Sequence, residues 1–209
     1  MIDVIHQINA VRRTVGNRVF EAREARSITV SQVYDSDLED VWDACTNADR
    51  IRRWFLPVSG ELRLGGRYQL EGHAGGEIQR CDPPKGFAAT WESGGQISWI
   101  ELRLTPVEDG TRFELDHIAH VSEEWGDFGP GAVGVGWDSI LLGIARHLTE
   151  PDFAVDPAEA MAWLSSEEGK AFVTASSNAW AEADIANGED EAVARAAAER
   201  TTAAYTATQ

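Results

Sequence analysis

The stretch from Asp40 to Tyr68, DVWDACTNADRIRRWFLPVSGELRLGGRY, combines a helix, an aromatic Arg-Arg-Trp-Phe turn at 52–55 and a strand that doubles back. In its first part apolar residues recur at helical spacing and acidic residues occupy the other face, which is typical of an amphipathic helix. Pro57 ends this pattern, because a proline pushes the preceding residue out of the α region. Gly65 and Gly66 then allow the backbone to reverse. We expect this stretch to close the open end of a curved sheet.

Composition indicates a soluble, acidic protein. The 209 residues are 43% hydrophobic, include 8 Trp and carry a formal net charge of −17. No apolar run approaches the roughly 18 residues that span a bilayer, and no signal-peptide pattern opens the chain. The negative charge repels DNA and anionic lipid, so we expect neither nucleic acid nor a membrane as partner. Cys45 and Cys81 form no disulfide framework, which favours the reducing cytoplasm.

Residue patterns divide the chain into three expected domains, an N-terminal helical arm at 1–25, a central domain at 26–149 and a helical C-terminal extension at 150–209. In the arm, apolar residues recur every three or four positions over residues 2–16, which predicts a helix. The extension is rich in Ala and acidic residues, and its helix-start signals predict three helices. Its apolar stripe favours packing on the outer face of the sheet, combined with a homodimer.

The central domain is predicted to contain an antiparallel sheet and a long helix. Strand patterns occur at 26–34, 68–72, 77–81, 87–92, 97–105 and 111–120. Short strands joined by tight turns indicate antiparallel pairing, and alternation gives the sheet one apolar face. The helix predicted at 131–148 has a broad apolar stripe that is expected to cover this face. The Gly-rich residues before it, 123–130, are interpreted as a loop.

Several motifs occur in order within residues 27–148. They are VWDACTNADRIRRWF at 41–55, LGGRY at 64–68, Cys81–Pro84, Thr90–Glu92, the segment from Gly110 to His117, and Gly136–Trp137. Together they resemble the activator of heat-shock-protein-90 ATPase homologue family, which belongs to the START-like or SRPBCC superfamily. The resemblance implies a helix-grip fold, in which a curved antiparallel sheet wraps around a long C-terminal helix and leaves a cavity between them. Superfamily members bind lipids, hormones or polyketides, and some are cyclases or aromatases.

The predicted fold is therefore α+β, a helix-grip domain with an all-helical C-terminal appendage. In such a fold, side chains from the turn, the sheet and the long helix would line a ligand cavity. The expected ligand-binding residues are Trp54, Phe55, Tyr68, Leu70, Trp91, Phe113, His117, Trp137 and Leu141. The same aromatic residues could simply fill the core, where truncation of a Trp to Ala costs ~3–5 kcal/mol. Trp99 lies two positions from Glu101 and so shares a strand face with it. Trp99 therefore faces either the core or the appendage.

His117 is the candidate catalytic residue, because alternation places it on the apolar face of its strand. It could bind a ligand carbonyl or act as a general acid or base. Alternatively it is a core histidine bonded to a neighbouring strand. Arg52 and Arg53 are either ligand-binding groups or partners of the nearby acids Asp49 and Asp43. No His or Cys spacing suits a metal, and we expect neither a metal nor another cofactor.

These patterns lead to one functional hypothesis and two alternatives. We expect a protein that binds a small apolar molecule, lipid-like or polyketide-like, in a helix–sheet cavity without defined catalysis. The first alternative is an enzyme of cyclase or aromatase type that uses His117 and a second polar group. The second is a chaperone-associated or homodimeric interaction protein.

Overall fold

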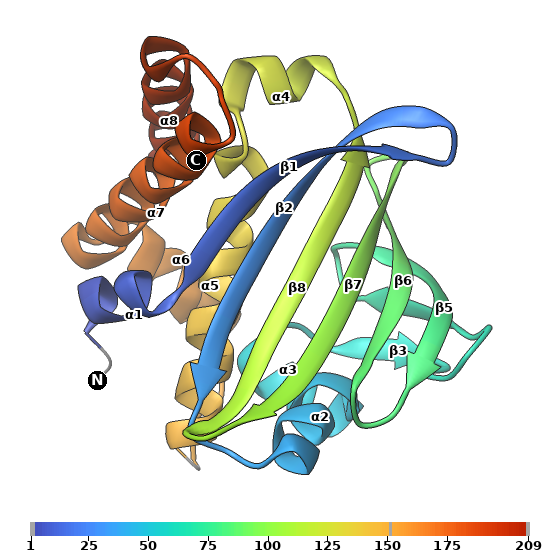
Figure 1. Ribbon diagram of the computed structural model, residues 1–209. Helices are drawn as coiled ribbons and strands as arrows, with labels where there is room; N and C mark the ends of the chain where they lie inside the picture. The colour runs from blue at the N-terminus through green and yellow to red at the C-terminus, as the bar shows by residue number, and fades with distance from the viewer. Residues whose placement is uncertain (1–2, 151, 208–209) are drawn as a thin grey trace. The chain divides into compact units, whose positions relative to one another are not determined.

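A computed structural model describes residues 3–150 and 152–207 of the chain (Figure 1). Within these residues, eight strands form one sheet in the order β1-β2-β8-β7-β6-β5-β4-β3. The strands are β1 (Arg12–Phe20), β2 (Arg23–Tyr34), β3 (Val58–Gly60), β4 (Arg67–Leu70), β5 (Gly75–Asp82), β6 (Gly86–Ser93), β7 (Gln96–Val107) and β8 (Gly110–His120). The helices are α1 (Val4–Ala10), α2 (Leu38–Thr46), α3 (Ala48–Trp54), α4 (Glu123–Phe128), α5 (Gly131–Thr149), α6 (Pro157–Leu164), α7 (Glu167–Ala186) and α8 (Glu191–Thr206). The predicted α+β class and helix-grip fold are confirmed.

The helix predicted for residues 2–16 is wrong after Ala10, where α1 ends and strand β1 soon follows. Val11 and Val15 are four positions apart, a spacing that puts two side chains on the same face of a helix and also on the same face of a strand. The turn from β1 to β2 uses Glu21 and Ala22 at φ values of 47° and 61°. Such a turn is normally signalled by Gly or Asn, and neither occurs here. Ile2, the first residue of the predicted helix, lies outside the described residues.

Two further segments differ from the prediction. The expected loop at 123–130 contains helix α4, which packs against α8. The Thr201 hydroxyl donates a hydrogen bond of 2.8 Å to the Phe128 carbonyl at the end of α4. This tertiary contact favours a helix that local composition does not predict. The Arg-Arg-Trp part of the predicted turn lies in α3, because the Asn47 side chain accepts from the Asp49 amide and starts a new helix.

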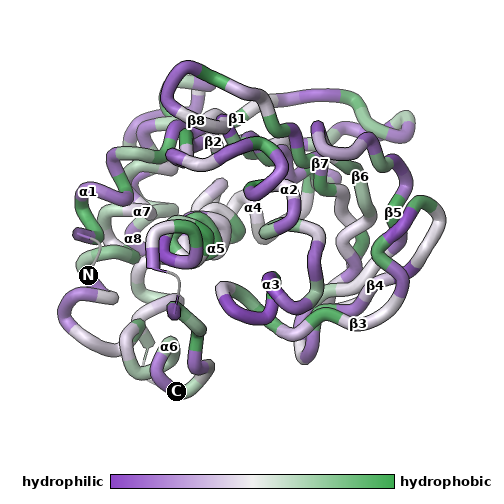
Figure 2. Tube along the Cα trace, turned by 90° about the horizontal axis from the view of Figure 1, so that it is seen from below, coloured by the Kyte–Doolittle hydropathy of each residue, from purple (hydrophilic) through white to green (hydrophobic). Residues whose placement is uncertain are grey.

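Contacts group the chain into two compact units that cut across β2 and α5. The first unit comprises Met1–Val30, His120–Leu142 and Asp156–Gln209. The second unit comprises Ser31–Ala119 and Gly143–Val155. Much of α5 is coloured as apolar in Figure 2. Within residues 3–150 and 152–207, none of the helices has the length and apolar character of a membrane-spanning segment.

In the first unit, α7 packs against α8, β1 and α1. Glycines on α5 allow two of these helices to approach closely. A Cβ atom on Gly134 would lie 2.2 Å from the ring of Trp180, and one on Gly131 would lie 3.2 Å from Thr201. Trp180 is fully buried. Gly131 and Gly134 are therefore positions where a larger residue would obstruct the packing of these helices.

A buried ion pair joins three elements of the first unit. Arg13 Nε on β1 lies 3.1 and 3.0 Å from the two carboxylate oxygens of Asp138 on α5. Ser176 and Trp180 on α7 donate to Asp138 Oδ2 over 2.5 and 3.1 Å. The Arg13 and Asp138 side chains are 6% and 1% exposed. Because a lone buried charge is costly, this network ties α7 to both β1 and α5.

In the second unit, the strands from β3 to β8 pair antiparallel with their neighbours. Directly opposite residues share a face of the sheet, so the register tests the predicted alternation. The apolar face carries the pairs Phe87–Leu102, Ala89–Ile100 and Trp91–Ser98, followed by Leu102–Leu115 and Ile100–His117. The predicted apolar face is confirmed, and His117 lies on it.

The Asp40–Tyr68 stretch contains most of α2, all of α3, strand β3 and the start of β4, and its helices pack on this sheet. Helix α2 contacts β7 and α3, and α3 contacts β3 (Figure 1). The Trp42 ring meets the Phe87 ring edge-on at 6.5 Å, which packs α2 onto the apolar face. The Trp54 indole donates a hydrogen bond of 3.0 Å to the Ala44 carbonyl, which fixes α3 against α2.

Candidate functional site

A continuous series of ring side chains runs through the second unit. Trp54 stacks on Phe55 with centroids 6.0 Å apart and planes at 15°. Phe55 meets His73 at 5.8 Å, and His73 meets Trp91 at 5.6 Å, both edge to face. Trp91 lies 6.2 Å from the ring of His117. These five side chains are called the aromatic row below.

The row draws its members from separate elements. Trp54 ends α3 and Phe55 caps it, His73 lies in the β4–β5 turn, Trp91 is on β6, and His117 is on β8. A Cβ atom on Gly143 would lie 2.4 Å from the Trp54 carbonyl oxygen, so Gly143 of α5 approaches the end of α3 closely. Tertiary contacts between these elements therefore bring the five rings together.

Burial differs along the row. The end members Trp54 and His117 are 9% and 7% exposed. Phe55 and Trp91 are half-buried, and His73 is exposed. The row is therefore fixed at both ends and accessible in its middle. Accessible ring faces and edges of this kind are suited to an apolar or aromatic ligand.

His117 has a defined partner. Its Nε2 lies 2.8 Å from the Ser98 hydroxyl oxygen. The Ser98 hydroxyl donates its single proton to the Trp91 carbonyl over 3.0 Å, so His117 Nε2 is the donor and Ser98 the acceptor. Burial lowers the pKa of His117 to about 4. At neutral pH the ring is therefore an uncharged imidazole with its proton on Nε2.

His73 differs from His117. Partial burial lowers its pKa from the ordinary value of 6.5, so it is neutral at physiological pH. Its backbone amide donates to the Leu70 carbonyl over 3.1 Å. Its ring makes aromatic contacts but no hydrogen bond to any other residue that the structure describes. His73 could not be predicted as a site residue from the sequence, because a single histidine in a turn follows no periodic pattern.

The structure separates the sequence-predicted ligand residues into groups. Trp54, Phe55, Trp91 and His117 meet in the aromatic row. Tyr68, Leu70 and Phe113 are buried on the sheet of the second unit. The Tyr68 hydroxyl donates to the Thr90 carbonyl over 2.8 Å, and Phe113 meets Tyr34 edge-on at 6.2 Å. Trp137 and Leu141 are buried residues of α5 in the first unit. Trp99 is buried too.

The two arginines of the aromatic turn have local partners. Arg52 forms an exposed ion pair of 3.4 Å with Asp49. Arg53 Nη2 donates to the Phe153 carbonyl over 3.1 Å. The arginine with several partners is instead Arg50, whose Nε donates to His147 Nε2 over 3.0 Å. Arg50 Nη1 also contacts two carboxylates of α2, those of Asp40 and Asp43.

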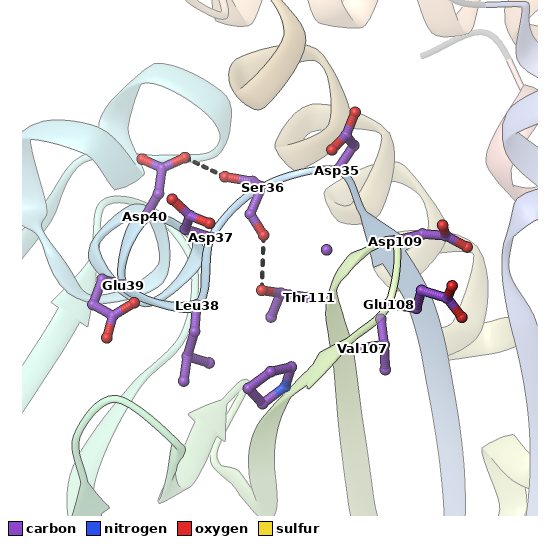
Figure 3. Close-up of a pocket in the computed structure, with 12 residues that line it drawn as sticks. Asp35, Ser36, Asp37, Leu38, Glu39, Asp40, Val107, Glu108, Asp109 and Thr111 are labelled. Carbon is purple, nitrogen blue, oxygen red and sulfur yellow. Dashed lines mark hydrogen bonds between the residues drawn. The ribbon is translucent and has the colours of Figure 1, made fainter.

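An open depression of about 1100 Å³ lies between the β2–α2 turn and the β7–β8 turn (Figure 3). Thr111 Oγ1 donates to the Ser36 carbonyl over 2.8 Å, and Ser36 Oγ donates to an Asp40 carboxylate oxygen over 2.5 Å. The acidic side chains of the lining are Asp35, Asp37, Glu39, Asp40, Glu108 and Asp109. Among the residues that the structure describes, no group of His, Cys, Asp and Glu is arranged to hold a metal. This depression contains no member of the aromatic row.

Comparison with known proteins identifies the family. Residues 35–149 match the family described as Activator of Hsp90 ATPase homolog 1-like protein. The crystal structure of CalU16 from Micromonospora echinospora is 38% identical, with a TM-score of 0.63, and the match covers 83% of this chain and 98% of that one. The solution NMR structure of CalU16 is 35% identical, with a TM-score of 0.70 and coverages of 86% and 97%.

A more distant structure shows the fold alone. DynU16, a protein of the dynemicin biosynthetic locus, is 19% identical with a TM-score of 0.51, and the match covers 60% of this chain and 48% of that one. No curated protein matches significantly. The family model matches more than half of the chain, and CalU16 is similar over most of it. This chain therefore belongs to the Activator of Hsp90 ATPase homolog 1-like family, within the START-like or SRPBCC superfamily.

Proposed function

We propose that the protein binds a small, uncharged apolar molecule against the aromatic row. The observation that carries this proposal is the accessible middle of the row, where Phe55 and Trp91 are half-buried and His73 is exposed. Phe55 and Trp91 thus keep part of their apolar surface in water, unlike Trp180 of the first unit, which is fully buried. A flat apolar ligand could stack on these rings and remove their faces from water.

The surroundings of the row support an uncharged ligand. The row continues onto an apolar sheet face through Trp91 and His117. The nearby polar pair, His117 and Ser98, is neutral and internally bonded. With a net charge of −17 the chain repels anions in general. An uncharged apolar molecule fits these conditions and agrees with the binding role that the family resemblance implies.

The geometry gives no specific support to catalysis by His117. General acid catalysis at neutral pH is most effective when the pKa of the acid lies near that pH. Burial lowers the pKa of His117 to about 4, far from that value. Its ring also donates Nε2–H to Ser98, which positions it as a fixed polar group of the sheet face. Ligand binding is therefore the function that we propose.

Titration of ¹⁵N-labelled protein with naphthalene, followed by backbone amide shifts, tests the proposal. We expect saturable shifts centred on the amides of His73, Trp91 and Ser98. Trp91→Leu should weaken binding by about three- to tenfold, because a ring pair contributes up to about 1.5 kcal/mol. Trp42→Leu is the matched control, because Trp42 is another half-buried Trp of the same unit outside the row. Shifts that never saturate, or equal losses in both variants, would contradict the proposal.

A further inference from the structure

We infer that His73 is the polar anchor of this site and that the preferred ligand is a neutral aromatic molecule with a hydroxyl group. This inference rests on the proposed function, because the aromatic row must first be a binding surface. It adds one specific requirement to that function, a hydrogen bond between the ligand and the imidazole of His73.

The first support is the fixed position of the ring. His73 lies between Phe55 and Trp91, and its ring plane makes angles of 69° and 70° with theirs. Its turn is tied together by the Gln69 amide, which donates to the carbonyls of Leu70, His73 and Ala74 over 2.7, 3.4 and 3.2 Å. A polar group that is held in place before binding loses little conformational entropy when a ligand arrives.

The second support is the hydrogen-bonding state of the ring. The imidazoles of His117, His120 and His147 each have a partner, at 2.8, 3.1 and 3.0 Å respectively. In the part of the chain that the structure describes, no residue forms a hydrogen bond with the ring of His73. Its nitrogen atoms therefore have no partner among these residues, and the ring lies beside the half-buried rings of Phe55 and Trp91. One ligand could stack on the neighbouring rings and bond to His73 at the same time.

The third support concerns the chemical class of the ligand. The neutral form of His73 prevails at physiological pH, since partial burial lowers its pKa. A neutral imidazole has one donor nitrogen and one acceptor nitrogen. A hydroxyl group can satisfy either nitrogen. A carboxylate would be bound best by imidazolium, which is the form that burial disfavours. A hydroxylated aromatic ring therefore matches this position better than an aromatic acid.

A matched pair of probes, 2-naphthol and naphthalene, tests the inference by the same amide-shift titration. The variant His73→Phe keeps a ring in the row and removes both nitrogen atoms. We expect wild-type protein to bind 2-naphthol about fivefold more tightly than naphthalene, the effect of one net hydrogen bond. In His73→Phe this preference should disappear, with naphthalene affinity retained. His6→Phe, which changes an exposed histidine of α1, should leave both affinities unchanged.

The outcomes separate this inference from the proposed function. Naphthalene binding by His73→Phe also reports that the variant is folded. If naphthalene binds but His73→Phe keeps the preference for 2-naphthol, His73 is not the anchor and only this inference fails. An equal affinity of wild-type protein for the two probes would also overturn it. If neither probe binds wild-type protein saturably, the proposed function fails and this inference fails with it.

Discussion

Replacing Asp138 by Asn should destabilise the first unit strongly. The substitution keeps the shape of the side chain but removes its negative charge. Arg13 would remain charged with a side chain that is 6% exposed. Breaking a buried ion pair from one side typically costs ~3–5 kcal/mol. Arg13 Nη1 would keep its bonds of 3.0 Å to the carbonyls of Ile8 and Val11. We therefore expect the free energy of unfolding to fall by about 3 kcal/mol, near the lower end of this range.

Equilibrium unfolding in urea at neutral pH, followed by far-ultraviolet circular dichroism, measures this loss. The matched control is the double variant Arg13→Met/Asp138→Leu, which removes both charges together. We expect the control to recover part of the lost stability, because no unpaired charge remains. The recovery is incomplete because Ser176 and Trp180 lose the carboxylate that accepts their hydrogen bonds. A decrease of less than about 1 kcal/mol in the free energy of unfolding of Asp138→Asn would contradict this prediction, since that is the scale of a solvent-exposed ion pair. A control that is no more stable than the single variant would also refute it.

Two further predictions concern the same unit. Gly134→Ala should lower the melting temperature, because its Cβ atom would lie 2.2 Å from the Trp180 ring and overpacking costs ~1–3 kcal/mol. An unchanged melting temperature would show that α5 and α7 are not closely packed. Burial, with a contribution from Glu189, raises the pKa of Asp184 to about 6 from 3.8, whereas Arg26 lowers it. Since the folded state binds this proton more tightly, the free energy of unfolding should fall as pH rises from about 4 to about 6. Asp184→Asn should flatten that decline in urea titrations, and an identical slope in the variant would contradict the assignment.

The sheet of the second unit was predictable because its signal is local. Alternation along β6, β7 and β8 placed Trp91, Ile100 and His117 on one face, and the register agrees. The N-terminal segment was not predictable in the same way. Its apolar spacing suited both a helix and a strand, and the Glu21–Ala22 turn has neither of the residues that usually mark such a hairpin.

The candidate site was predictable only in part. Trp54, Phe55 and Trp91 could be predicted as ligand-binding residues because they are large aromatic residues in the turn and the sheet. The place of His73 depends on how the β4–β5 turn meets the end of α3 and strand β6, which no local pattern encodes. The same holds for Arg13 and Asp138, which are 125 positions apart in the chain. Both features result from tertiary packing.

The most direct test of the central claim is to locate a bound aromatic probe. Intermolecular nuclear Overhauser effects between naphthalene and the side chains of the labelled protein would provide this location. We predict contacts from the probe to the rings of Phe55, His73 and Trp91, the accessible part of the aromatic row. Contacts confined to another part of the chain, or no specific contacts at saturating probe, would contradict the claim that the row is a ligand-binding site.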